Sequence, residues 1–226
     1  MLEVLSYKVY DLKESVIASG NAMRLEPAEY TDEEFEKGLK RIKKLVNASK
    51  SGNIRCHDNA LVGIRVSLDI KYPLYWSPEA QRYHFFDIVT SSSTMHRLCK
   101  MDIRKATNKY VSPNSIKEMR VHVDNYNRIL NDESIDYFEY WDTNGEEDKL
   151  THVEGRKEAL YAAFVTMRSN CPSGLELFMR VSTNYKQLQT MYYQRQHHKL
   201  IEDWQDGFCD WVETLPYFKE IIIGKD

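Results

Sequence analysis

The segment RSNCPSGLELFMRVSTNYKQLQTMYYQR, residues 168–195, begins and ends with an arginine, and its pattern would place Arg168 and Arg195 on defined elements. Apolar and polar residues alternate over 175–182, which is typical of a strand with one buried face. Asn184 is a candidate N-cap for a following helix, and Arg195 would share one face of that helix about three turns on. A helix N-terminus attracts phosphate and an arginine can hold a second anion, so this spacing suits an elongated phosphate-bearing ligand. The alternative is a surface helix with one solvated arginine.

A second group of candidate residues lies between positions 79 and 97. Ser77-Pro78 predicts a helix start, which would make Glu79 and Arg82 an ordinary i,i+3 pair worth roughly a few tenths of a kcal/mol. Arg97 follows a serine-rich stretch and is either an anion ligand or a solvated side chain. A serine nucleophile needs a histidine and a carboxylate to activate it. The sequence shows no such arrangement around these serines, so it does not identify a nucleophile.

The composition bounds the class of protein. A chain of 226 residues can bury a substantial core, and we expect a single domain over residues 1–226. A hydrophobic content of 42%, a charged content of 29% and a net charge of -3 fit a soluble protein and argue against a general nucleic-acid coat. No apolar run approaches the roughly 18–20 residues that span a bilayer, and the N-terminus does not read as a signal peptide. The four scattered cysteines lack zinc-ligand spacing, so we expect no metal site and a cytoplasmic location.

The elements that must position the candidate residues indicate an α+β domain. Strands are expected over residues 4–10, 16–23, 61–71 and 175–182. Helices are expected behind a capping box at Thr31 and Glu34, from Ser77-Pro78, over 113–130 and 154–169, and over 185–214 with a break near 197–198. The acidic and polar segment 131–152, with Asn144-Gly145 as a turn, is expected to be a surface excursion or a lid.

Other conspicuous residues have simple structural explanations. Trp204, Phe208 and Trp211 are spaced as a helical core stripe. The tyrosines at 185, 192 and 193 could stack on a base or flavin, but amphipathic packing is the simpler interpretation. The adjacent pair His197-His198 has no carboxylate or cysteine at ligand spacing and is expected to be solvated.

Taken together, the motifs resemble those of the flavin-dependent thymidylate synthases, which make dTMP with FAD. In that family an arginine lies four residues before a proline, as Arg168 does here before Pro172. A strand and a Thr-x-Asn-x-Arg-x-Leu helix start follow, with a further arginine eleven residues after the asparagine, as Arg195 stands after Asn184. The segment CHDNALVGIRVSLDI is similar to the family's His-Glu-Ser-x-Leu-Glu-His-x-x-Phe-Thr-Phe strand entry. The positions in register are His57, Asp58, Leu61 and Ser67. The resemblance covers most of residues 16–214.

The chain departs from the family at its signature, which is Arg-His-Arg followed by serine and a later Ser-x-Arg. Here the signature reads Arg82-Tyr83-His84 followed by Asp87, and the last arginine is Arg97. Met95 stands at the serine position two before it, with Ser93 just upstream. Only the first and last arginines therefore keep their type.

Further departures affect the base and flavin positions. Glu79 replaces a family glutamine, Gly63 replaces a histidine, and Lys186 replaces the arginine of Asn-x-Arg. Lysine lacks the bidentate fork of arginine, and the histidine of the altered signature, His84, is largely neutral near pH 7. The resemblance therefore implies FAD binding that is weaker than in typical members.

The resemblance implies a fold like that of flavin-dependent thymidylate synthases, with an antiparallel or mixed sheet flanked by long helices. It implies a homotetramer with active sites between subunits, and C5 methylation of dUMP to dTMP with FAD, NADPH and methylenetetrahydrofolate. The alternatives are a pyrimidine nucleotide hydroxymethylase and a non-catalytic nucleotide-binding protein on the same fold. Arg195 is the implied catalytic residue. The implied substrate-binding residues are Glu79, Arg82, Ser93, Arg97, Arg168 and Arg195, and the implied cofactor-binding residues are Ser67, Tyr83, His84, Asn184 and Lys186.

Overall fold

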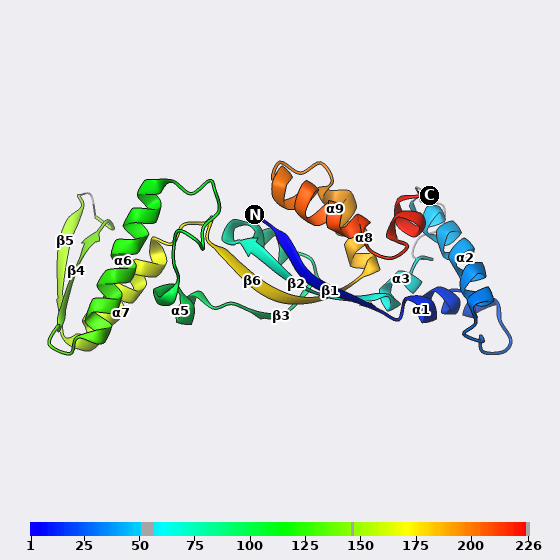
Figure 1. The fold of residues 1–226 in the computed structure, drawn as a ribbon, viewed down its shortest axis with the longest axis horizontal. Helices are drawn as coiled ribbons and strands as arrows, with labels where there is room; N and C mark the ends of the chain where they lie inside the picture. Colours follow the sequence, from blue (N-terminus) through cyan, green and yellow to red (C-terminus); the bar gives the residue numbers. More distant parts are fainter. Residues whose placement is uncertain (51–56, 146, 225–226) are drawn as a thin grey trace. The chain divides into compact units, whose positions relative to one another are not determined.

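The computed structural model describes residues 1–50, 57–145 and 147–224 (Figure 1). The chain divides into two compact units. Unit 1 comprises Met1–Tyr72, Trp76–Ser91 and Phe178–Asp226, and unit 2 comprises Pro73–Tyr75 and Ser92–Leu177. Within the described ranges, none of the helices has the length and apolar character needed to cross a membrane.

A four-stranded sheet forms the centre of unit 1, with the strand order β1-β2-β6-β3. Its strands are β1 (Glu3–Tyr10), β2 (Arg65–Pro73), β6 (Glu176–Asn184) and β3 (Asp87–Ser91). The pairs β1–β2 and β3–β6 are antiparallel. Alternation of apolar and polar residues in β2 and β6 places one face of each strand in the core, as the sequence predicts. The predicted α+β class with an antiparallel sheet is confirmed.

Aromatic side chains join the sheet to the C-terminal helices of unit 1. After β6 the chain forms α8 (Tyr185–Arg195), a π-helical stretch (Ile201–Cys209), α9 (Asp210–Glu213) and a short π-helical turn (Lys219–Ile223). The predicted break near residues 197–198 is confirmed. Trp204 packs on Trp76 with ring centroids 4.8 Å apart and on Phe208 at 5.4 Å, and all three rings are fully buried. The predicted core stripe is therefore confirmed.

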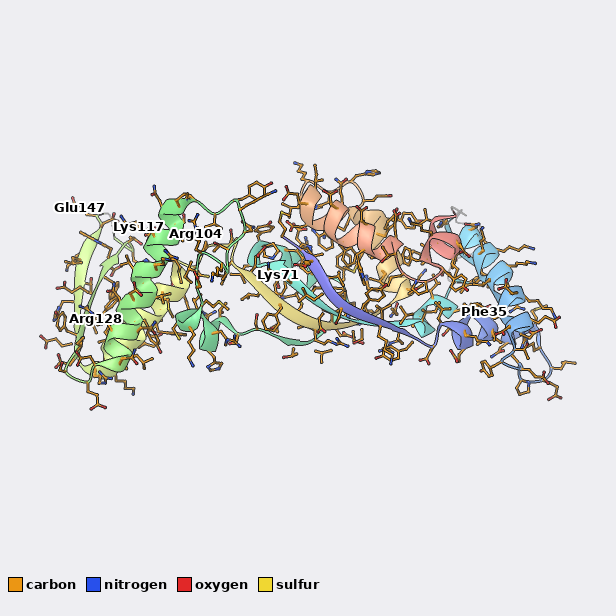
Figure 2. All side chains as sticks on the ribbon, in the orientation of Figure 1. Phe35, Lys71, Arg104, Lys117, Arg128 and Glu147 are labelled. Atoms are coloured by element: carbon orange, nitrogen blue, oxygen red, sulfur yellow. The ribbon has the colours of Figure 1, made fainter. Side chains whose placement is uncertain are left out.

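The N-terminal region of unit 1 corrects one prediction. Residues 16–23 were expected as a strand, but they belong to α1 (Leu12–Ala18) and a single 3-10 turn (Asn21–Met23). Val16 and Ile17 are adjacent and both fully buried, because α1 packs against α2 (Asp32–Lys50). An adjacent buried pair gives no helical period, which is why the short helix reads as a strand. The predicted cap of α2 is confirmed, since the Glu34 N–H donates to Thr31 Oγ1 over 3.2 Å. Phe35 lies in the first turns of α2 (Figure 2). Its ring packs edge-on against Tyr217.

Gly38 permits the close approach of α1 and α2. A Cβ atom at this position would lie 2.7 Å from the Val16 carbonyl oxygen, closer than two non-bonded atoms can pack. Gly38→Ala is therefore expected to lower the free energy of unfolding by about 1–3 kcal/mol in urea unfolding. Gly145→Ala is the control, because a Cβ there meets its nearest atom at 3.5 Å. Equal stability of the two variants would contradict this packing.

The remaining elements of unit 1 are short. α3 (Ala60–Gly63) precedes β2, so the predicted strand over 61–71 begins four residues late, at Arg65. A 3-10 turn (Leu74–Trp76), whose first two residues belong to unit 2, leads into α4 (Ser77–Ala80), which begins at the predicted position. α4 ends at Ala80, before the signature segment begins.

Unit 2 contains two long helices and a hairpin (Figure 1). α5 (Thr94–Arg97) and a 3-10 turn (Leu98–Lys100) precede α6 (Pro113–Asn131) and α7 (Arg156–Ser169). Lys117 and Arg128 mark the two ends of α6 (Figure 2). The predicted helices over 113–130 and 154–169 are both confirmed, and Ser112 caps α6 by accepting from the Ser115 N–H over 3.1 Å.

The segment 131–152 contains two strands that the sequence did not predict. They are β4 (Tyr137–Asp142) and β5, which extends slightly beyond the segment (Lys149–Glu154), and they pair in an antiparallel hairpin. Phe138 is buried against Ile129, Ala159 and Ala163, which join the hairpin to α6 and α7. The alternating pattern is short and interrupted by acidic residues, so the polar composition concealed the strands.

Candidate functional site

Arg195, at the C-terminal end of α8, lies in a cluster of polar and aromatic side chains in unit 1. Its Nη1 donates to Glu79 Oε2 over 2.9 Å, and its Nε donates to the Tyr83 hydroxyl over 2.7 Å. The guanidinium lies over the Trp204 ring, 4.5 Å from its centroid. Only 13% of the Arg195 side chain is exposed. The third nitrogen, Nη2, makes no hydrogen bond to the described chain, so it remains available to a ligand.

Glu79 connects this cluster to the π-helical stretch. Its Oε2 also accepts from Trp204 Nε1 over 2.8 Å, and His198 Nε2 lies 3.4 Å from the same oxygen. Its Oε1 has no partner among the described residues and is not a buried atom. The expected i,i+3 pair with Arg82 is wrong, because α4 ends at Ala80 and the chain turns away from helical geometry.

His198 was expected to be solvated, and the structure corrects that expectation. The Leu200 N–H donates to His198 Nδ1 over 3.2 Å, so in the neutral ring the proton resides on Nε2, which faces Glu79. The ring packs edge-on against Trp204 with centroids 6.0 Å apart. The helix break after Arg195 brings His198 back to the cluster, and spacing along a continuous helix could not reveal that return.

The altered signature segment lies beside this cluster. Tyr83 is buried, and its hydroxyl donates to Gln194 Oε1 over 3.0 Å. Arg82 and His84 are exposed, and the Arg82 side chain has no ion pair within the described chain. The Phe85 N–H donates to Gln187 over 3.3 Å, which fixes the segment to α8. The side chains of Arg82 and His84 are therefore accessible to solvent on a segment that is hydrogen-bonded to α8.

The two residues of the altered Asn-x-Arg motif have partners within the chain. Asn184 Oδ1 accepts from the Gln187 N–H over 2.9 Å, which confirms its predicted role as the N-cap of α8. Lys186 Nζ forms an ion pair with Asp58 Oδ2, and Asp58 is 1% exposed. The other oxygen, Asp58 Oδ1, is buried and accepts no hydrogen bond from the described chain. Sequence reasoning placed Asp58 in register with a family motif but did not predict this pair.

Ser67 lies on the exposed face of the sheet, opposite Lys8 of β1. Next to it on β2, Asp69 accepts from the Ser6 hydroxyl and from Arg180 Nη1, each over 2.6 Å. These hydrogen bonds, that of Ser6 first, hold the pKa of Asp69 below its usual value although burial opposes them. Asp69 is therefore ionised at neutral pH, and this face of the sheet carries paired charges.

Three of the predicted substrate-binding residues belong to unit 2. Ser93 caps α5 by accepting from the Met95 N–H over 3.1 Å. Arg97 is exposed at the end of α5, and its side chain has no ion pair within the described ranges. Arg168 is exposed in the last turn of α7, where its guanidinium contacts the Met95 sulfur. Both arginines are thus free to bind an anion.

The structure brings together Glu79, Tyr83 and Arg195 by direct hydrogen bonds. The other predicted residues of unit 1 lie outside this set of contacts: Ser67, Arg82, His84, Asn184 and Lys186. Among the residues that the structure describes, no three His, Cys, Asp or Glu side chains form a group suited to a metal ion. The cluster can therefore offer a ligand a guanidinium donor and a carboxylate acceptor side by side.

No protein-family model matches the chain, and no curated protein matches it in sequence. Two solved structures of flavin-dependent thymidylate synthase ThyX from Helicobacter pylori, both with FAD and dUMP, are similar to it in fold. One is 15% identical with a TM-score of 0.61, and the other is 13% identical with a TM-score of 0.59. Each similarity covers 98% of this chain and 97% of the other chain. A UMP/dUMP methylase, PolB from Streptomyces cacaoi bound with 5-Br dUMP, is 13% identical with a TM-score of 0.48, over 88% of this chain and 79% of that chain. The chain has a ThyX-like fold.

Proposed function

We propose that this protein binds a pyrimidine deoxynucleotide and transfers a one-carbon group to C5 of its base, with methylation of dUMP to dTMP as the leading reaction. The observation that carries the proposal is the similarity in fold, over nearly the whole of both chains, to an enzyme whose structures contain FAD and dUMP. A shared fold does not by itself determine function. The second support is therefore the set of arginines that stand at the positions of the resembled motifs.

The arginines are proposed to bind the nucleotide. Arg97 and Arg168 are exposed guanidinium groups without carboxylate partners in the described chain, and guanidinium suits a phosphate dianion. Arg195 is proposed to act on the nucleotide through its free Nη2, as the catalytic residue. Glu79, Arg82 and Ser93 complete the proposed substrate set, in which Glu79 Oε1 offers an acceptor to an N–H of the base.

We propose that the residues near Lys186 bind FAD, with limited donor strength. Asp58 Oδ1 is a buried acceptor without a partner, so an N–H or O–H of a ligand would satisfy it. The proposed flavin-binding residues are Ser67, Tyr83, His84, Asn184 and Lys186. When bound, FAD would supply the redox chemistry, with NADPH as reductant and methylenetetrahydrofolate as the one-carbon donor. The chain would orient the base and exclude water around it.

FAD is expected to dissociate during purification. Lys186 is occupied by Asp58, and His84 stands where the resembled motif has an arginine, so fewer strong donors remain for the pyrophosphate. The test is fluorescence titration of apo-protein with FAD, for the wild type and for a His84→Arg, Lys186→Arg double variant. Tighter binding by the double variant is expected. Stoichiometric FAD in the wild type after extensive dialysis would contradict this interpretation.

A second candidate function is a non-catalytic nucleotide-binding protein. The observation that favours it is the occupation of Arg195 and Lys186 by carboxylates of the same chain. A purified protein that binds dUMP but never binds FAD would support this candidate. A protein that binds FAD and forms 5-hydroxymethyl-dUMP would instead support the hydroxymethylase variant.

The proposal includes assembly and location. We propose a homotetramer with active sites between subunits, in agreement with the resemblance, and a cytoplasmic enzyme. Cys99, Cys171 and Cys209 are free thiols, which fits a reducing compartment. Cys56 lies outside the described residues. Burial raises the pKa of Cys171 to about 11 and that of Cys209 to about 12, so both remain thiols at neutral pH.

A further inference from the structure

Helix α7 exposes four residues along one of its faces. Tyr161 is 71% exposed and Val165 is 40% exposed, and both are apolar. Glu158 and Arg168 flank them along the same face and are exposed as well. The spacings are three, four and three residues, which is the a and d spacing of a coiled-coil seam. We call these four residues the α7 seam.

The charges of the α7 seam have no ion-pair partners of their own. Glu158 forms no salt bridge within the part of the chain that the structure describes. Arg168 likewise has no carboxylate partner there, and its guanidinium contacts the Met95 sulfur. The opposite face of α7 is already used, because Ala159, Ala163 and Met167 are buried. A helix that is apolar on both faces is typical of one that packs on a second surface as well as on its own core.

The α7 seam is complementary to itself when two copies run antiparallel. Positions 158 and 168 lie five residues on either side of 163, and positions 161 and 165 lie two residues on either side. A two-fold axis at 163 therefore sets Glu158 of one copy against Arg168 of the other, and Tyr161 against Val165. A two-fold symmetric interface makes each contact twice. The α7 seam would therefore form two Glu158–Arg168 ion pairs, one on each side of the apolar contacts between Tyr161 and Val165.

A groove beside the seam supplies further contact area. Its volume is about 420 Å³, and it lies between α7 and the β4–β5 hairpin. Its walls include Tyr140, Val153 and Ala162, together with Tyr161 and Val165 of the seam. A stable dimer buries about 1,200–2,000 Å² in total, which a single 14-residue helix would not provide alone. The groove and the hairpin beside it widen the surface toward that requirement.

We infer that the α7 seam is an interface with a second copy of this chain, formed by antiparallel pairing of α7 with α7. This inference goes beyond the proposed chemistry and does not depend on which ligand the protein binds. Arg168 keeps its proposed role at the phosphate, because its guanidinium has five N–H donors and a carboxylate uses one edge of it. The pairing would place the Arg168 of each copy at a subunit junction.

The test is sedimentation velocity at micromolar concentrations with two charge-reversal variants, Glu158→Arg and Arg168→Glu. Alone, each variant would set like charges against each other twice, so we expect its self-dissociation constant to rise tenfold or more, equivalent to about 1.4 kcal/mol per factor of ten. An equimolar mixture of the two restores both ion pairs, in a dimer of one Glu158→Arg chain with one Arg168→Glu chain. We expect the mixture to associate as tightly as the wild type.

A third variant, Tyr161→Ala, tests the apolar centre of the seam. Its matched control is Tyr30→Ala, because Tyr30 is 59% exposed and lies outside the seam. Only Tyr161→Ala should weaken association. A wild-type protein that sediments with a mass of 26.7 kDa, the mass of one chain, would overturn the inference. An equimolar mixture that associates as weakly as each charge-reversal variant alone would also overturn it. A wild type that dimerises but does not bind dUMP would count against the proposed function alone.

Discussion

Replacing Lys186 with methionine is expected to lower the free energy of unfolding by about 3 kcal/mol. The substitution removes the cation that pairs with Asp58, which is 1% exposed, and leaves a carboxylate buried without a partner. Breaking a buried pair costs about 3–5 kcal/mol. We expect the lower end of that range, because 35% of the Lys186 side chain is exposed and water can approach. Urea unfolding followed by circular dichroism measures the difference.

The control for this substitution is Lys37→Met on α2. Lys37 pairs with Glu33 over 2.8 Å, but its side chain is 56% exposed and that of Glu33 is 79% exposed. Water screens an exposed ion pair, so this variant should be nearly as stable as the wild type. If the two variants lose stability equally, Asp58 does not depend on Lys186.

Nucleotide binding is expected to weaken tenfold to a hundredfold in Arg195→Ala and in Arg168→Ala. Each loses a charge-assisted contact to the nucleotide worth about 1.5–3 kcal/mol. Calorimetric titration with dUMP measures the loss. Arg195→Lys should recover only part of it, because an ammonium lacks the planar fork that reaches Glu79 and a ligand together.

Arg104→Ala is the control for these titrations, because Arg104 is an exposed arginine of unit 2 with no proposed role in the site. Its affinity for dUMP should match that of the wild type. Wild-type affinity in Arg195→Ala or Arg168→Ala would remove that arginine from the proposed site. Circular dichroism of Arg195→Ala is needed beside the titration, since Glu79 loses its partner in that variant.

The elements that the sequence predicts correctly are those with a clear local signal. Alternation in β2 and β6 arises because one face of each strand is buried, and the caps at Thr31, Ser112 and Asn184 are local hydrogen bonds. The strand predicted over residues 16–23 and the strands missed within 131–152 reflect the lack of a clear local signal. The first is a helix too short to show a period, and the second is a hairpin whose exposed positions carry much of its polarity.

The candidate site was only partly accessible from sequence. The motifs identified Glu79, Tyr83 and Arg195 one by one, but their mutual hydrogen bonds join α4, the signature loop and α8, which no spacing encodes. The participation of His198 depends on the break after Arg195, and the partner of Lys186 lies 128 residues away. Contacts of this range follow from tertiary packing rather than from local pattern.

The measurement that tests the central claim most directly follows hydrogen release from C5 of the nucleotide. Any one-carbon transfer to C5 replaces the hydrogen there, so dUMP carrying tritium at C5 must release it to water. With FAD, NADPH and methylenetetrahydrofolate supplied, we predict tritium release that requires FAD and is lost in Arg195→Ala. Absence of release from the wild type under saturating FAD and dUMP would contradict C5 transfer, and bound dUMP in the same sample would then identify a nucleotide-binding protein.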